Sequence, residues 1–187
     1  MQIIKNALPQ DYFEEIVEIV NNPNFNFFLS FDSNDEYSET VIHDLKHIKT
    51  PQLIHTLIND NKDNSNYINF FEKSFLLLKE KYNLKGNILK SKINLLLNNS
   101  KCQTKDIYNT PHVDCDLNHT STILFLNKSD GHTFIFNESF PNYSKILTIK
   151  EMVEPEPNKL IIINNNFHAS SNPINYSTRL VLNTVFI

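Results

Sequence analysis

Residues 160–187 read LIIINNNFHASSNPINYSTRLVLNTVFI. Two runs of apolar and β-branched residues, 160–163 and 178–187, lie on either side of a polar stretch rich in Asn and Ser. Short apolar runs bounded by turn residues are typical of buried β-strands. This end of the chain is therefore predicted to contain two strands separated by a connecting segment.

The same pattern of short apolar runs separated by polar segments extends upstream to residue 88. Further strands are predicted at 88–97, 120–126, 133–136 and 145–153, and turn-forming residues separate them at 127–131 and 154–157. Many short strands with turns between them favour a sandwich or a jelly roll. We expect residues 88–187 to form such a core.

The first 87 residues are predicted to be mainly helical. After a short strand at 2–7, a helix begins at Leu8-Pro9 and carries apolar residues at helical spacing, and the longest helix is predicted at 66–82. A strand is predicted at 24–31, and Pro51 suits the first turn of a helix at 51–59. The expected fold class is α+β, a double-stranded β-helix (jelly roll) with N-terminal helices packed on one sheet. Residues 1–187 are expected to form one domain, with 1–87 as helical support.

Composition narrows the classes of function. The two glycines in 187 residues argue against a glycine-rich phosphate loop, and a net charge of -4 argues against a polyanion binder. No apolar run reaches membrane-spanning length, no signal peptide is evident, and two cysteines suit a reducing compartment. We expect a cytoplasmic monomer or homodimer with no membrane or nucleic-acid partner. Abundant Asn, Ile and Lys with one Arg is typical of an AT-rich genome, such as that of a marine phage or a low-GC microbe.

The chemistry-bearing residues are a His-x-Asp triplet, a later histidine and the only arginine. His112 and Asp114 are two residues apart, which on a strand places both side chains on one face, and His168 would come from a neighbouring strand. Two histidines and one carboxylate are the ligand set of non-haem Fe(II) oxygenases. Arg179, eleven residues after His168, would supply a fixed charge for an acidic co-substrate, and Asn183 shares its strand face.

Each of these features has a simpler interpretation by itself. The triplet could be a polar pair at a strand end, His168 could be a hydrogen-bonded core residue, and Arg179 could pair with an acid such as Glu138. His43 and His47, spaced four apart, could instead meet one metal on a helix. The combination of the triplet with His168 and the sole arginine favours the iron site.

With the motif placed on strands, the chain resembles the 2-oxoglutarate and Fe(II)-dependent dioxygenases, particularly the prolyl-4-hydroxylase-like branch and its small phage-encoded relatives. The resemblance covers most of the chain. It includes the strand-Leu-Pro-helix start, 110–114 (TPHVD), 122–127 (TILFLN), 130–134 (DGHTF), 160–169 (LIIINNNFHA) and 177–183 (STRLVLN).

The resemblance implies a role for each of the motif residues. His112, Asp114 and His168 would hold Fe(II), and Arg179 would bind the distal carboxylate of 2-oxoglutarate, with dioxygen as the further co-substrate. Many relatives also place tyrosines in the co-substrate pocket, which this sequence lacks at the corresponding strands. The substitutes predicted for these tyrosines are Asn94, Tyr108 and Thr122.

The expected activity is hydroxylation of an unactivated C–H bond, with release of succinate and CO2. A protein or peptidyl side chain such as proline is the substrate class that the family suggests. The alternatives are a small metabolite or free amino acid as substrate, or a catalytically silent jelly-roll binding module; nucleic-acid demethylation ranks behind these. Specificity is expected to reside in 98–109 and 31–51.

Overall fold

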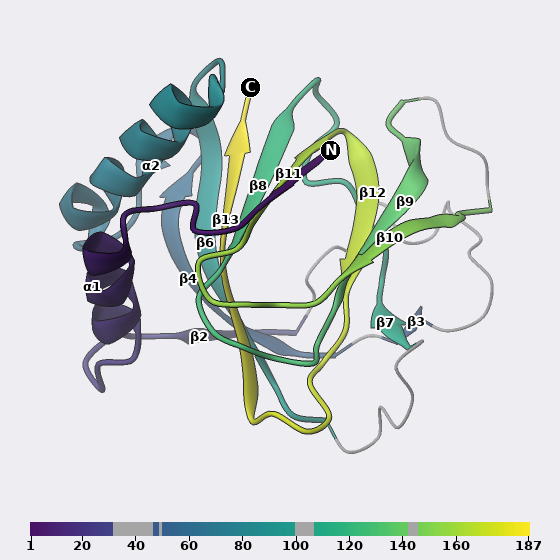
Figure 1. Ribbon diagram of the computed structural model, residues 1–187, viewed down its shortest axis with the longest axis horizontal. Helices are drawn as coiled ribbons and strands as arrows, with labels where there is room; N and C mark the ends of the chain where they lie inside the picture. Colours follow the sequence, from purple (N-terminus) through teal and green to yellow (C-terminus); the bar gives the residue numbers. More distant parts are fainter. Residues whose placement is uncertain (32–46, 49, 100–106, 142–145) are drawn as a thin grey trace.

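Two sheets face each other in the computed structural model of the protein, which describes residues 1–31, 47–48, 50–99, 107–141 and 146–187 (Figure 1). The large, eight-stranded sheet has the order β1 (Gln2–Ile4), β11 (Leu160–Asn164), β8 (Thr120–Phe125), β13 (Thr178–Phe186), β6 (Ile88–Leu97), β4 (Gln52–Asn59) and β2 (Phe28–Ser30), with β5 (Lys62–Asp63) paired to β4. The small sheet has the order β10 (Ile149–Val153), β9 (Thr133–Ser139) and β12 (Asn166–Ser170). A further parallel pair joins β3 (His47–Ile48) and β7 (Tyr108–Asn109).

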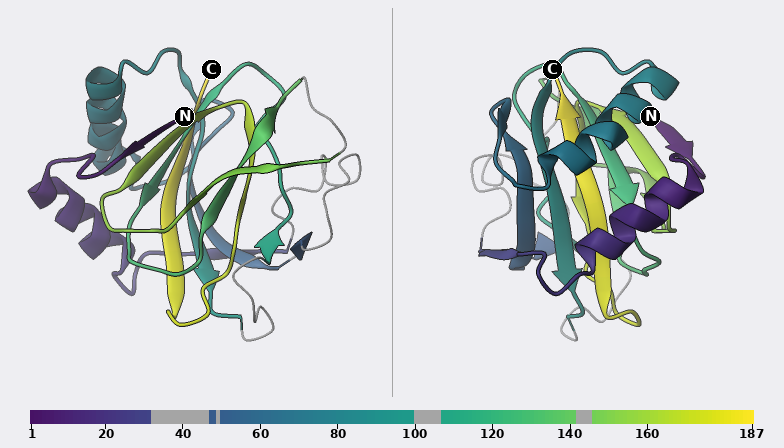
Figure 2. Two further views of the ribbon diagram at one scale, coloured as in Figure 1. Left: turned by 45° about the vertical axis from the view of Figure 1, so that its right-hand side comes forward. Right: turned by 90° about the vertical axis from the view of Figure 1, so that its left-hand side faces the viewer.

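Both helices cover one face of the large sheet (Figure 2). The amphipathic patterns predicted for them are confirmed by α1 (Gln10–Val20) and α2 (Ile68–Tyr82), whose apolar faces join one core cluster with the sheet. Phe13 and Phe71 pack there with Leu124 of β8. Neither described helix is long and apolar enough to cross a membrane.

The opposite face of the large sheet meets the small sheet. Ile123 of β8 and Val181 of β13 belong to one buried cluster with Ile135 of β9 and Val153 of β10. This is the interior of the jelly roll, and the expected α+β class is confirmed. The first 87 residues do more than provide helical support, because β1, β2 and β4 extend both edges of the large sheet.

The prediction of a helix at 51–59 is wrong, because Gln52–Asn59 is strand β4, paired with both β2 and β6. The register shifts between Thr56 and Ile58, so that the neighbours Leu57 and Ile58 are both buried. A bulge of this kind breaks the alternation of a strand and makes its apolar spacing look helical. Pairing on two sides then decides the conformation.

The Asn run at 164–166 is the corner where the chain leaves the large sheet for the small one. Asn165 has a φ of 52°, a left-handed conformation that asparagine tolerates better than most residues. Its side chain accepts a hydrogen bond from the His119 amide at 2.7 Å and donates one to Asn118 at 2.8 Å. This corner begins β12, which carries His168; His168 was expected on a neighbouring strand, but no bounds were predicted for that strand.

Some of the sequence predictions concern segments that lie wholly or partly outside the described residues. Most of 31–51 and of 98–109, the segments expected to set specificity, lies outside the described residues, as do His43 and Cys102. His47 begins strand β3, which argues against the helical histidine pair. The start of the strand predicted at 145–153 is also outside, and β10 begins at Ile149.

Candidate metal centre

His112 and His168 are joined through their backbones. Each amide donates to the carbonyl of the other residue at 2.9 Å, which forms an isolated antiparallel bridge. His168 therefore does come from a strand beside the triplet. The triplet itself, however, is not a regular strand, since this one bridge is its only ladder pairing among the described residues. Pro111 lacks an N–H and cannot continue a ladder on that side.

Val113 nevertheless points away from the two polar side chains, as the alternation predicts. It is buried in a cluster behind the small sheet with Phe134, Phe136 and Phe167. This apolar anchor fixes the backbone of the triplet. The side chains of its two neighbours are thereby turned toward the space between the sheets.

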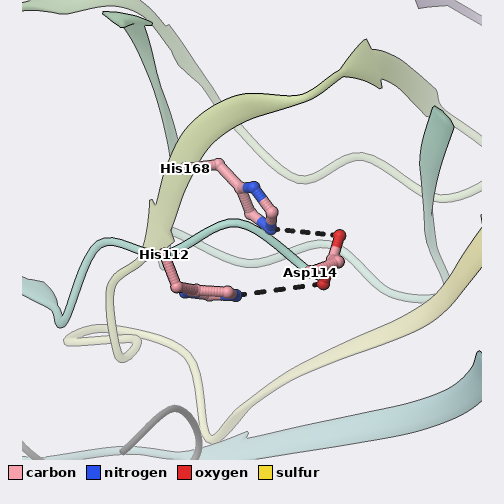
Figure 3. A group of neighbouring side chains, drawn as sticks. All are labelled: His112, Asp114 and His168. Carbon is pink, nitrogen blue, oxygen red and sulfur yellow. Dashed lines mark ion pairs between the residues drawn. The ribbon is translucent and has the colours of Figure 1, made fainter. Parts of the chain in front are cut away.

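Three donor groups converge in that space (Figure 3). The ligand atoms of His112, Asp114 and His168 all lie within 4.8 Å of one another. The Nε2 atom of His112 is 4.0 Å from Asp114 Oδ1, and that of His168 is 3.6 Å from Asp114 Oδ2. Two imidazole nitrogens and one carboxylate oxygen that share one face of a metal position form a donor set that suits Fe(II).

Backbone carbonyls hold both imidazole rings in position. Nδ1 of His112 lies 3.1 Å from the Thr110 carbonyl, and Nδ1 of His168 lies 3.2 Å from the Asn166 carbonyl. A carbonyl can only accept, so each Nδ1 carries the proton and each Nε2 presents its lone pair to the centre. Burial, followed by the neighbouring His168, lowers the pKa of His112 to about 3. The His112 ring is thus neutral at physiological pH, as metal binding requires.

The Asp114 carboxylate is held by two side chains from the large sheet. Asn183 of β13 donates its amide to Oδ1 at 3.1 Å, and Ser121 of β8 donates its hydroxyl to Oδ2. Burial raises the pKa of Asp114, but the two imidazoles and the Ser121 hydrogen bond outweigh it, and the pKa lies below its ordinary value. The carboxyl group is therefore ionised and oriented before any ligand arrives.

Arg179 reaches the same cavity from β13. It is 3% exposed; Nε donates to the Gly131 carbonyl at 2.8 Å and Nη2 to Thr133 Oγ1 at 2.6 Å. Burial lowers the pKa of Arg179 to about 10, so the guanidinium stays charged at neutral pH. Among the described residues it has no carboxylate partner; the suggested partner Glu138 bonds to Thr148 instead.

His112 and His168 share one cavity with Arg179. Apolar Ile123, Ala169 and Val181 form part of its wall, and the polar lining consists of Asn94, His112, Thr133, His168, Ser170, Arg179 and Asn183. Asn94 and Asn183, which were predicted from the sequence to lie near the co-substrate, therefore do line this cavity.

Thr122 and Tyr108, the other two residues predicted to replace the family's tyrosines, do not line this cavity. Thr122 lies on the opposite face of β8, where its hydroxyl donates to the Thr184 carbonyl at 3.3 Å. Tyr108 packs behind the small sheet against Phe134, with ring centroids 5.0 Å apart. In both cases the neighbouring residue faces the site, Ser121 in place of Thr122 and Asn109 in place of Tyr108.

The sequence offered little signal for the phase of these strands. In β8, Ile123, Leu124 and Phe125 are all buried because both faces of the strand are covered, so no alternation distinguishes the faces. Gly131 and Thr133, which hold Arg179, and Lys92, which lies beside the centre, were likewise not predicted as site residues.

No family model matches the sequence, and no curated protein is similar to it in sequence. Solved structures do match the fold. A prolyl hydroxylase from Trichoplax adhaerens, in complex with a hypoxia inducible factor peptide fragment, is 15% identical with a TM-score of 0.61, over 100% of this chain and 82% of that one. A 2OG-Fe(II) oxygenase family oxidoreductase from Burkholderia pseudomallei is 12% identical with a TM-score of 0.60, over 98% and 84%.

A prolyl-4-hydroxylase from Pseudomonas putida is 15% identical with a TM-score of 0.53, over 99% of this chain and 91% of that one. At this level of identity the likeness establishes the fold. The chain has the double-stranded β-helix of the 2-oxoglutarate and Fe(II)-dependent oxygenases, as the sequence resemblance predicts.

Proposed function

We propose that this protein is a non-haem Fe(II)- and 2-oxoglutarate-dependent dioxygenase, with His112, Asp114 and His168 as the iron ligands. The observation that carries the proposal is one cavity lined by two members of the three-donor group, His112 and His168, and by a buried guanidinium without a carboxylate partner among the described residues. A structural metal site has no use for such a cation. A dicarboxylate co-substrate needs both the metal and the cation. One of its ends would bind the metal, and the carboxylate at its other end would pair with the arginine.

When bound, iron together with 2-oxoglutarate and dioxygen would supply the oxidation of an unactivated C–H bond, with release of succinate and CO2. The chain's own residues provide position and shielding. Arg179 would grip the distal carboxylate through its free N–H groups, while Ser121 and Asn183 orient Asp114. The apolar wall of Ile123, Ala169 and Val181 would limit the access of water.

For the substrate, the sequence resemblance supports a protein or peptidyl side chain such as proline. Two of the fold neighbours are prolyl hydroxylases, one of them bound to a peptide fragment. A free amino acid or other small metabolite is the alternative substrate, and a silent binding module is the alternative function. We further propose that residues 1–187 act as one dioxygenase domain, because β1, β2 and β4 complete the sheet that carries the site. The free, buried thiol of Cys115 is compatible with a reducing cytoplasm.

An anaerobic titration with Fe(II) and 2-oxoglutarate tests the proposal. We expect a visible charge-transfer band that forms only when both are bound, because the band requires the keto acid to chelate the metal. Either component alone should leave the spectrum unchanged. A folded protein that binds Fe(II) but never develops the band would favour the silent binding module.

Gly131→Ala is expected to weaken 2-oxoglutarate binding about tenfold, because the new methyl group would displace the arginine. A Cβ at this position would lie 2.6 Å from the Ser171 carbonyl oxygen and 3.0 Å from Arg179 Cδ. The Ser171 backbone oxygen cannot easily retreat, so residue 131 itself must shift, and with it the carbonyl that accepts from Arg179 Nε. The measurement is the 2-oxoglutarate concentration that produces half of the band.

Gly86→Ala is the matched control, since its Cβ would also collide with backbone, at the Ile187 carbonyl oxygen, but away from the site. It should lower stability without changing 2-oxoglutarate affinity. Equal affinity in Gly131→Ala and the parent would show that Arg179 tolerates the displacement.

A further inference from the structure

A second cavity lies against the metal-binding group on another side. It shares Asn94, His112, Ser170 and Asn183 with the cavity of Arg179, so the two spaces meet at the centre. The residues found only in the second cavity are Thr50, Gln52, Lys92, Leu96, Asn109 and Thr110. Apart from Leu96 this lining is polar, unlike the partly apolar wall around Arg179.

Among the residues that the structure describes, Lys92 is the only charged one that lines the second cavity without belonging to the metal-binding group. It lies on β6, directly opposite Asn183 of β13 in the sheet register. Among the described interactions its ammonium group has neither a hydrogen bond nor an ion pair. Burial lowers the pKa of Lys92, and the neighbouring Asp114, whose two oxygens already accept from Ser121 and Asn183, opposes that shift. Because burial disfavours the charged form of an amine, an anionic ligand in the same cavity would stabilise Lys92 as the ammonium.

Most of the other polar groups in the wall already satisfy one another. Thr50 donates to Asn109 at 2.7 Å, and Asn109 donates to Ser170 at 3.3 Å and to Asn172 at 3.2 Å. Asn172 in turn donates to the Leu97 carbonyl at 2.9 Å. This network holds the rim rigid and leaves few groups to recognise a ligand.

Two amide oxygens are the exception. Asn94 Oδ1 and Asn183 Oδ1 are buried and accept no hydrogen bond from any described residue. Asn183 is only 6% exposed, and its orientation is set because its nitrogen donates to the Asp114 carboxylate, which can only accept. A buried acceptor without a donor is costly, so these oxygens call for an N–H or O–H group on a ligand.

We propose that the second cavity binds a carboxylate group of the substrate, paired with Lys92, while N–H or O–H groups of the same molecule reach Asn94 and Asn183. This inference rests on the proposed function, since Arg179 would be occupied by 2-oxoglutarate and Lys92 would remain for a second acid. The carboxylate has two sources, the α-carboxylate of a free amino or hydroxy acid, or an acidic side chain beside the target residue in a peptide.

Matched acid and amide probes test the proposal. They are free amino acids against their amides, such as L-proline against L-prolinamide, and proline peptides with neighbouring Asp or Glu against the same peptides with Asn or Gln. Binding is measured by calorimetry on anaerobic protein loaded with Fe(II) and 2-oxoglutarate. We expect at least one acid to bind about tenfold more tightly than its amide, as expected for a charge-assisted contact. The arm that shows this preference identifies the source of the carboxylate.

The preference should disappear in Lys92→Met, which keeps the length of the side chain, and persist in Lys92→Arg. Lys62→Met, on exposed β5, controls for net charge. Equal binding of acids and amides across the panel, or a preference that survives Lys92→Met, would overturn the inference. So would loss of 2-oxoglutarate binding in Lys92→Met, because Lys92 would then hold the co-substrate. Failure of the charge-transfer band in the parent would instead remove the proposed function.

Discussion

Arg179→Ala is expected to lower the affinity for 2-oxoglutarate about 100-fold and to leave Fe(II) affinity nearly unchanged. The guanidinium has five N–H groups, and its contacts to Gly131 and Thr133 among the described residues use two of them. The remaining donors are available to a carboxylate in the cavity. Because the site is buried, such a contact is little weakened by water or salt.

The measurement is the charge-transfer titration, together with a separate Fe(II) binding curve in the absence of 2-oxoglutarate. Arg179→Lys is the matched control. It keeps the charge but not the planar fork, so it should lose only part of the affinity. If 2-oxoglutarate turnover and affinity in Arg179→Ala equal those of the parent, Arg179 does not bind the co-substrate.

Asp114→Ala is expected to weaken Fe(II) binding by more than about 100-fold and to abolish the charge-transfer band. Two neutral imidazoles would remain, without the anionic ligand that balances part of the metal's charge. The substitution also removes the acceptor of both Ser121 and Asn183, which leaves these buried donors unpaired.

Fe(II) affinity is measured anaerobically in Asp114→Ala and in Asp116→Ala. The second variant is the matched control, because Asp116 carries the same charge two residues away but is exposed. It should bind iron like the parent. Parent-like affinity in Asp114→Ala, with the variant folded by thermal melting, would exclude Asp114 as a ligand.

Site residues predicted from residue type and spacing were placed more accurately than those predicted from the phase of a strand. His112, Asp114, His168 and Arg179 were predicted from residue type and spacing. The structure brings the donor atoms of the first three within 4.8 Å of one another and places His112, His168 and Arg179 on one cavity. Thr122 and Tyr108 were each one position away from a residue that faces the site. A strand reverses its faces with every residue, so an error of one in phase exchanges a cavity residue for a core residue.

Lys92 shows a different limit. In the sequence it lies on the strand predicted at 88–97, and it was not singled out as a site residue. Only the pairing of β6 with β13 reveals that it lies opposite Asn183, beside the centre. A charged residue on a strand carries no local mark of whether that face meets water or a cavity.

The sequence alone predicted the fold class, the two described helices, eight of the described strands and the four motif residues proposed as the site. These depend on local periodicity and on rare residues at set spacings, which the chain carries whatever its neighbours are. The tertiary structure alone decided that 52–59 is a strand with a bulge, that Asn165 turns the chain into β12, and which faces of β6, β7 and β8 line the cavities. Those features depend on pairing between segments distant in sequence, where contacts on both sides of a strand override its own preference.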